Sequence, residues 1–270
     1  MKIFNLHFLL YLLLFLVLSI SGCASPPWGK IVSEQVSNET GQLYGRFIEQ
    51  SKECSSGFDG DVIARFHTQL KNITQAGFFQ MLEPSYIKIV VSNPLGQPLL
   101  VISSNARIYQ ELNSINRTFK TVTHRSFSIR NEIPPSFMRG HWFAWLTGRP
   151  LSDDYQIRAI REDPEARGVW LEIGADTEAA TALEHVLMDF SGNHLIERII
   201  VAEDGSFQAT ISYADWQTIS ACEQPMNISV SGLSFGATAN LMFSDLREAE
   251  LKPRDFNLPY PQGYRRQYLP

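Results

Sequence analysis

Apolar and polar residues alternate with a period of two over most of the chain from Phe58 onward. In residues 62–67, for example, every second residue is Val62, Ala64 or Phe66. A period of two is typical of half-buried β-strands. The same kind of pattern predicts strands at 62–67, 86–91, 99–103, 106–112, 117–123, 169–173, 182–190, 195–201, 207–213, 227–231 and 237–243. Such a succession of short strands without intervening helices predicts a mainly β fold of the α+β class, with an antiparallel sheet that curls toward a barrel.

Two turn signals join neighbouring strands. Pro94, Leu95 and Gly96 lie between residues 86–91 and 99–103, and this arrangement predicts a hairpin. An Asp-Gly pair at 204–205 lies between two later strands and predicts a second hairpin.

Residues 23–57 have a different pattern. Pro26 and Pro27 are expected to stiffen the beginning of this segment, whereas Leu43, Phe47 and Ile48 recur at helical spacing. We therefore expect a linker followed by a helix that packs on the main body.

An aromatic segment interrupts the strand pattern in the middle of the chain. The apolar and aromatic positions that fall on one helical face are Phe137, Met138, His141, Trp142, Trp145 and Leu146. Gly148 and Pro150 supply a helix stop. The helix could pack as ordinary core on the sheet, or it could be a lid over a cavity, and spacing alone leaves both interpretations open.

The chain begins with a pattern of export and lipidation. Lys2 precedes an apolar run at residues 8–18, and the run ends on residues 20–23, Ile-Ser-Gly-Cys, which resemble a bacterial lipobox. We expect residues 1–22 to be a signal peptide and Cys23 to carry a diacylglycerol. The alternative is a transmembrane helix with an incidental cysteine, but the run is shorter than the roughly 20 residues that a span needs. Ala24, in the position where an aspartate would favour inner-membrane retention, points to the outer membrane, with the body facing the periplasm.

Composition limits the classes of partner. The chain of 270 residues carries a formal charge of −5, so no global positive charge recruits nucleic acid or anionic lipid. The length suits one large β domain, or one domain with appendages.

Two cysteines remain after Cys23. In an oxidising periplasm, Cys54 and Cys222 are candidates for a disulfide that would tie the N-terminal region to a late strand. Two free, buried thiols are the alternative.

An enzyme is not expected. Residues 232–236, Gly-Leu-Ser-Phe-Gly, fit the nucleophile elbow of serine hydrolases, but strand-like alternation follows where the elbow needs a helix. The last histidine is His194, which precedes the serine, so no catalytic base lies downstream. The histidines are not at metal-ligand spacing, and no phosphate-binding glycine loop occurs. We therefore expect neither a metal nor a cofactor.

Two segments resemble the LolB family of outer-membrane lipoprotein receptors. Residues 87–101 look like that family's hairpin of strand, Pro-Leu-Gly-Gln and strand. Residues 138–150 are similar to its tryptophan-containing helix, which ends in Leu-x-Gly-x-Pro. The resemblance covers residues 58–252 as a half-barrel domain and leaves residues 253–270 as a tail.

The resemblance implies a half-open antiparallel barrel whose helices cover or plug an apolar cavity. The cavity would receive the acyl chains of lipoproteins from a periplasmic carrier protein and release them into the outer membrane, without covalent chemistry. The matched helix adds Phe143 to Phe137, Met138, Trp142, Trp145 and Leu146 as candidate cavity or lid residues. The alternative is an envelope lipoprotein that binds a free lipid or a protein partner without transferring anything.

Leu95 is the candidate membrane-insertion residue. A leucine at a hairpin tip has no second strand to cover it, and burying it in a bilayer would contribute about 1.5 to 3 kcal/mol. The family inserts a leucine from such a loop, and Leu95 matches it. Alternatively, the side chain folds back on its own hairpin. Arg265 and Arg266 in the tail could contact headgroups, although a flexible terminal peptide is expected there.

Overall fold

The computed structural model describes residues 26–68, 71–105, 107–131, 141–151, 155–175, 184–202, 205–233 and 236–269. Cys23, Phe137 and Met138 lie outside these ranges, so their roles stay predictions. No helix within the described ranges is long and apolar enough to cross a membrane.

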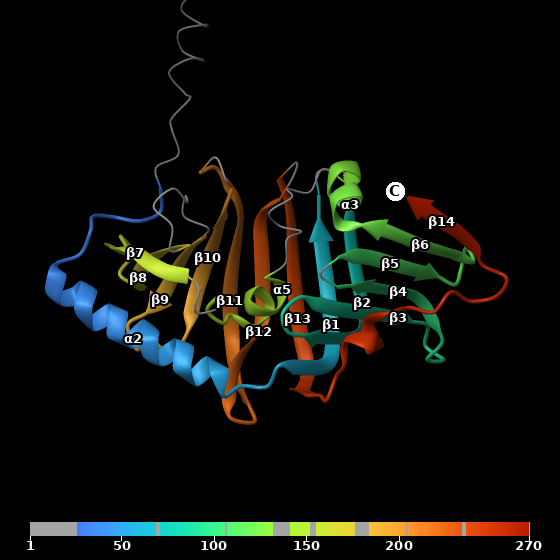
Figure 1. The fold of residues 1–270 in the computed structure, drawn as a ribbon, viewed down its shortest axis with the longest axis horizontal. Helices are drawn as coiled ribbons and strands as arrows, with labels where there is room; N and C mark the ends of the chain where they lie inside the picture. Colours follow the sequence, from blue (N-terminus) through green and yellow to red (C-terminus); the bar gives the residue numbers. More distant parts are fainter. Residues whose placement is uncertain are drawn as a thin grey trace, which may run out of the picture.

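One curved sheet of 14 strands forms the body, and the predicted half-open antiparallel architecture is confirmed. Its order is β14-β6-β5-β4-β3-β2-β1-β13-β12-β11-β10-β9-β8-β7, and the sheet bends around α5 without closing (Figure 1). The strands are β1 (Gly57–His67), β2 (Asn72–Leu82), β3 (Tyr86–Ser92), β4 (Pro98–Ser104), β5 (Ile108–Asn113), β6 (Thr118–Thr123), β7 (Tyr155–Glu162), β8 (Gly168–Ala175), β9 (Glu184–Asp189), β10 (Leu195–Val201), β11 (Phe207–Ile219), β12 (Cys222–Leu233), β13 (Ala237–Glu248) and β14 (Arg265–Leu269). The helices are α2 (Glu34–Lys52), α3 (His124–Asn131), α5 (Trp142–Thr147) and the 3₁₀ turn η2 (Pro253–Phe256).

A β-bulge bends the sheet where β1 pairs with β13. The register shifts between Asp59 and Asp61, where Gly60 of β1 lies opposite two residues of β13, Asp245 and Leu246, so that β13 carries the extra residue. A Cβ atom at Gly60 would lie 2.8 Å from the Cα atom of Leu246, so only glycine fits there. Bulges of this kind increase local curvature, which brings the flanking strands around the concave face.

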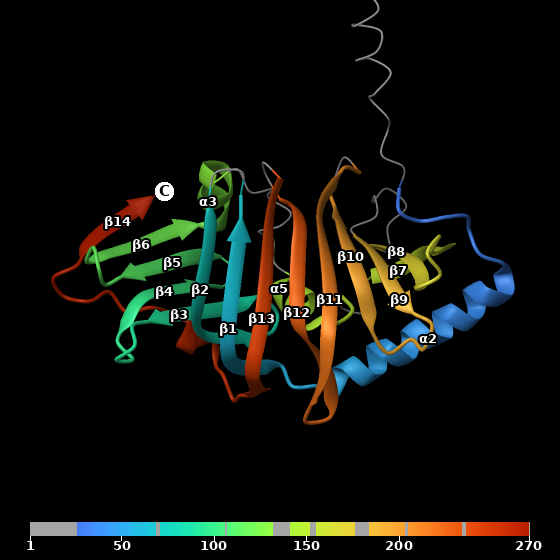
Figure 2. The same cartoon turned by 180° about the vertical axis from the view of Figure 1, so that it is seen from behind.

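The main hydrophobic core fills the concave face. Strand residues such as Phe79, Leu171 and Ile228 are fully buried, and they belong to the same cluster as residues of α2 and α5. The helix residues in this cluster are Tyr44, Phe47, Phe143, Trp145 and Leu146. The two helices therefore cover the concave side, whereas the opposite view shows strands in front of α5 (Figure 2).

Helix α2 is the helix that the apolar spacing predicts in residues 23–57. The side chain of Ser33 caps its N-terminus by accepting from the N–H of Val36. A disulfide between Cys54 and Cys222 ties its far end to the start of β12, with 5.7 Å between the Cα atoms. The sequence separation is 168 residues, and in the loop-entropy model so long a closure stabilises the fold by about 5 kcal/mol.

The segment before α2 covers one edge of the sheet. The N–H of Gly29 donates to the oxygen of Glu162 at 2.8 Å, and the N–H of Val32 donates to the oxygen of Ile160 at 3.1 Å. Trp28 stacks on His185, with 3.9 Å between the ring centroids. Because it also joins the cluster of Trp170 with Leu187, Ile199 and Val201, this segment buries part of the outer face of β8–β10.

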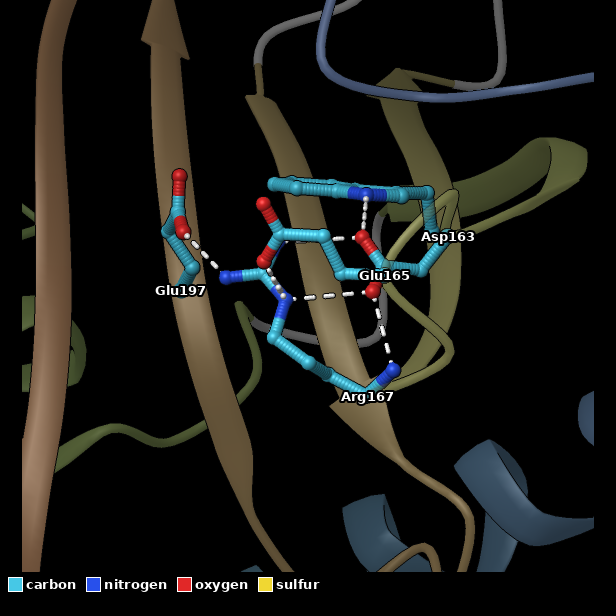
Figure 3. Close-up of polar contacts among 5 residues, drawn as sticks. Asp163, Glu165, Arg167 and Glu197 are labelled. Carbon is cyan, nitrogen blue, oxygen red and sulfur yellow. Dashed lines mark hydrogen bonds and ion pairs between the residues drawn. The ribbon is translucent and has the colours of Figure 1, made fainter.

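A polar cluster fixes the turn between β7 and β8 (Figure 3). Arg167 grips the Asp163 carboxylate with two hydrogen bonds, of 3.1 and 3.0 Å, while the Trp170 indole donates to Asp163 at 3.0 Å. Arg167 also pairs with Glu165 at 3.1 Å and with Glu197 at 3.4 Å. Burial alone would raise the pKa of Asp163, but the hydrogen bonds from Arg167 and Trp170 lower it below its usual value. The cluster has internal partners for its charges and is therefore a structural feature.

The expectation of a flexible C-terminal peptide is wrong. Arg265–Leu269 form β14, which pairs with β6 in parallel, in register from Arg265 with Thr118 to Leu269 with Val122. The free edge of β6 offers backbone donors and acceptors, and β14 satisfies them. Two further strands, β2 and β7, were not among the predicted strands.

Candidate binding site on the concave face

Helix α5 ends where the sequence predicts. Gly148 adopts a left-handed conformation, with φ of 63°, and its N–H bonds the oxygen of Ala144. A Cβ atom at Gly148 would lie 2.6 Å from the Trp216 ring, so glycine is required both by the turn and by the packing. The spacing predicts His141 on the helical face, but the described helix begins at Trp142, and His141 is its N-cap.

The aromatic side of α5 faces the sheet. Phe143 stacks on Phe58 of β1, with 6.2 Å between the centroids, and Trp145 is almost fully buried. Trp142 is half-buried and contacts the Trp145 ring edge to face at 5.4 Å. Phe143, Trp145 and Leu146 thus fill the concave face, so α5 is a plug whose removal would expose apolar surface.

Arg149 follows the plug and connects it to the rest of the site. Its Nη1 atom donates to the oxygen of Ser55 at 2.8 Å, and its guanidinium lies over the rings of Phe58 and Phe143 at 5.4 and 5.1 Å. Burial lowers the pKa of Arg149 to about 10. Its Nε and Nη2 atoms have no hydrogen-bond acceptor among the described residues. The site therefore holds two buried donors that could bind a carbonyl or a carboxylate.

A buried ion pair lies beneath the plug. Arg198 of β10 and Glu184 of β9 are 0% and 2% exposed, and Nη1 lies 3.3 Å from Oε2. Arg198 also donates to the main-chain oxygen of Arg149. Burial raises the pKa of Glu184, with Arg198 opposing it, and burial also raises the pKa of the neighbouring Tyr213. Burial would lower the pKa of Arg198, but Glu184 raises it above its usual value, so the guanidinium stays charged.

Sequence patterns did not identify Arg149, Glu184 and Arg198 as site residues. Glu184 and Arg198 are charged residues within otherwise apolar strands, on the face that alternation assigns to the core. That conflict with the strand pattern was a signal of a buried pair, because charges on such faces need partners.

Two cavities lie beside the plug, with volumes of about 460 and 450 Å³. They share Ser51, Cys54 and Arg149, at the end of α2. The first also contacts Phe47, Trp216, Gln50 and Glu223, and the second Ile48, Leu151, Lys52 and Glu83. Both are of small-molecule size, but their walls mix polar with apolar residues, unlike the apolar cavity that the resemblance implies.

The β3–β4 hairpin presents Leu95 to solvent. The N–H groups of Leu95 and Gln97 both donate to the Asn93 side chain at 3.0 Å, and Gly96 has a φ of 78°. Leu95 is 84% exposed, so it does not fold back on its own hairpin. Pro94 and Gly96 are exposed beside it.

The serine motif at residues 232–236 joins the end of β12 to β13. Ser234 lies outside the described residues, but β13 begins at Ala237, so a strand follows the motif in place of the helix that an elbow needs. Whether the protein has any enzymatic activity stays a prediction.

Neither a protein-family model nor a curated protein matches the sequence. Solved structures do match. An outer membrane lipoprotein-sorting protein domain from Vibrio parahaemolyticus is 13% identical, with a TM-score of 0.55, over 81% of this chain and 97% of that one. A LolA superfamily protein from Nitrosomonas europaea is 13% identical, with a TM-score of 0.53, over 81% and 99%. A DUF1329 family protein from Desulfovibrio piger is 10% identical, with a TM-score of 0.55, over 82% and 96%. The similarity concerns the fold, and the chain has a LolA-like fold.

Proposed function

We propose that this protein is an outer-membrane lipoprotein that binds acyl chains of lipoproteins on the concave face of its sheet and helps to place them in the outer membrane. The observation that carries the proposal is the plug α5. Phe143, Trp145 and Leu146 occupy apolar volume that an acyl chain could take, and two cavities already flank this helix. The described similarity to a lipoprotein-sorting domain supports the same class of cargo.

The energetics suit a carrier. Displacing α5 exposes apolar surface, which costs about 25 cal/mol per Å², and an incoming acyl chain covers that surface again. Binding is then an exchange of one apolar occupant for another. Because the bilayer is equally apolar, release into it costs little, and transfer needs no covalent step.

Arg149 supplies a polar contact for such cargo. An acyl chain on a lipoprotein ends in an ester or amide carbonyl, which accepts hydrogen bonds. The unpartnered Nε and Nη2 donors of Arg149 lie beside the ring of Phe143, at the plug. We propose that the cargo carbonyl takes these donors while the hydrocarbon takes the place of the plug.

Cys23 supplies the attachment. The lipobox pattern at residues 20–23 would give the mature protein a diacylglycerol, and two or more acyl chains on one residue make a stable anchor. Palmitate labelling of the native chain tests this step. Labelling that persists after Cys23→Ala would contradict it.

A transfer assay tests the function. The unlipidated chain from residue 24, which keeps every described residue, is mixed with a carrier protein loaded with radiolabelled lipoprotein, and the label on each protein is then counted. We expect the label to move to this chain and then to added liposomes. Leu95→Glu should still accept cargo but deliver it poorly. Glu250→Gln, a change of an exposed residue elsewhere, is the control and should leave both uptake and delivery unchanged. No uptake by the unchanged protein would refute the proposal.

The packing of the concave face favours a second candidate. The core beneath α2 and α5 is tightly buried, and it contains the charged pair Glu184 and Arg198. A non-transferring envelope lipoprotein that binds a free lipid or a protein partner would need no displacement of α5. Uptake of a fatty acid without uptake of lipoprotein would favour this candidate.

A further inference from the structure

Two apolar hairpin tips lie side by side at one end of the sheet. Leu100 of β4 pairs with Asn113 of β5, and the N–H of Ser114 donates to the oxygen of Leu99 at 2.9 Å. The β3–β4 and β5–β6 turns therefore project from the same end, on the right in Figure 1. Leu95 and Ile115 at these tips are 84% and 71% exposed, the highest values for large hydrophobic side chains in the described ranges.

β14 brings arginines to the same end. Arg265 is paired with Thr118, next to the β5–β6 turn, and its N–H donates to the oxygen of Arg117 at 2.8 Å. Arg266 lies over the ring of Tyr260, with 5.6 Å to the centroid. The side chains of Arg117, Arg265 and Arg266 are all exposed. Leu95, Ile115, Arg117, Tyr260, Arg265 and Arg266 together are called the tip surface.

The charge of the tip surface is one-sided. Residues 93–98, 113–119 and 258–269 contain no aspartate or glutamate, although the whole chain carries a charge of −5. Within the part of the chain that the structure describes, no ion pair involves Arg117, Arg265 or Arg266. The fold thus collects unpaired cations at one end of an acidic protein.

Protruding aliphatic tips, an interfacial tyrosine and flanking arginines match the layers of a bilayer surface. The aliphatic side chains suit the acyl boundary, tyrosine suits the headgroup level, and guanidinium groups suit phosphate. We propose that the tip surface binds a bilayer that contains anionic phospholipid, with Leu95 and Ile115 in the acyl boundary and the three arginines on headgroup phosphates. The inference rests on the proposed membrane location, and adds Ile115 and the arginines to the role of Leu95.

Vesicle flotation of the unlipidated chain from residue 24 tests the tip surface. Vesicles of phosphatidylcholine alone are compared with vesicles that also contain phosphatidylglycerol, at low and at high salt. We expect binding to the phosphatidylglycerol vesicles that weakens at high salt. Each arginine near an anionic surface raises partitioning about fivefold, so Arg117→Gln with Arg265→Gln and Arg266→Gln should lower it about 100-fold.

A matched control removes the same charge elsewhere. Arg46, Arg65 and Arg254 are exposed and lie outside the tip surface, and their replacement by glutamine should leave most of the binding. Leu95→Glu with Ile115→Glu should abolish it. Unchanged thermal melting of each variant shows that these surface changes leave the fold intact. Equal losses in the two triple variants, or no binding of the unchanged protein to phosphatidylglycerol vesicles, would overturn the proposal.

Cargo uptake in solution is measured separately, without vesicles. If cargo uptake fails but vesicle binding still depends on the tip surface, the proposed function is refuted and the proposal about the tip surface is retained. Uptake that succeeds while the arginine variant binds vesicles normally overturns the tip surface alone.

Discussion

Arg198 donates a hydrogen bond to the main-chain oxygen of Arg149, so a buried strand residue holds the chain directly after the plug. The same guanidinium is paired with Glu184. One side chain therefore links β9, β10 and the end of α5.

Removing one member of this pair should destabilise the fold strongly. Arg198→Met leaves the Glu184 carboxylate buried without its partner, and we expect a loss of about 3 to 5 kcal/mol in the free energy of unfolding. Guanidinium titration at fixed disulfide state measures it. Arg198→Met combined with Glu184→Leu should recover most of the loss, and a double variant as unstable as the single one would contradict this account.

Arg149 should distinguish acylated cargo from plain hydrocarbon. In Arg149→Met, the two free donors are lost, and we expect an acylated peptide with an ester carbonyl to bind about tenfold more weakly or worse. An apolar fluorescent probe without a carbonyl should bind as before. Trp142 and Trp145 are available as energy donors for both titrations. Equal losses for the two ligands would argue for a packing role alone.

The disulfide should contribute a large part of the stability. Cys54→Ser with Cys222→Ser releases a closure of 168 residues, and the loop-entropy model gives a loss of about 5 kcal/mol. Thermal unfolding of the variant measures this loss. The reduced unchanged protein serves as the control and should melt at a similar temperature, whereas a variant as stable as the oxidised protein would refute the expectation.

Acid should destabilise the outer face through His185. Burial, aided by Arg161, lowers the pKa of His185 to about 4, below the usual value near 6.5. The unfolded chain therefore binds more protons than the folded one between about pH 6.5 and 4, so stability falls as the pH falls through that window. We expect His185→Gln to flatten this slope in unfolding titrations. A slope that is unchanged in the variant would assign the effect to other groups.

Trp28 should hold the N-terminal segment on β7. Trp28→Ala removes its stacking on His185 and its contact with Trp170, and because Trp28 is only partly buried we expect a loss of about 1 to 3 kcal/mol in the free energy of unfolding. Hydrogen exchange of the Gly29, Val32 and Glu162 amides should accelerate. Amides between β12 and β13 are the internal reference, and uniform acceleration across the sheet would point to global unfolding.

The sequence could predict the elements that local patterns determine. Alternation of apolar and polar residues located β1, and glycine with proline located the end of α5 and the β3–β4 turn. Each of these signals depends on neighbouring residues. These elements can therefore be predicted without knowing their partner strands.

Elements that depend on distant partners escaped prediction. In β2, Phe78 and Phe79 are consecutive apolar residues, so the period of two is lost, and pairing with β1 and β3 decides the strand. β14 pairs with β6 from far along the chain, and the edge β7 is paired with residues near 31. The pair of Glu184 and Arg198 depends on which strand faces meet beneath α5. Those contacts are set by the tertiary fold.

The docking of Gly29 on β7 and of Trp28 on β8 and β9 limits the distance between Cys23 and the folded body. Five residues lead from Cys23 to Trp28, and a fully extended chain of that length reaches about 18 Å. If Cys23 is embedded in lipid, this short connection keeps the β7 edge close to the headgroups. Any donor of cargo must then approach the membrane surface, since this acceptor cannot travel out to meet it.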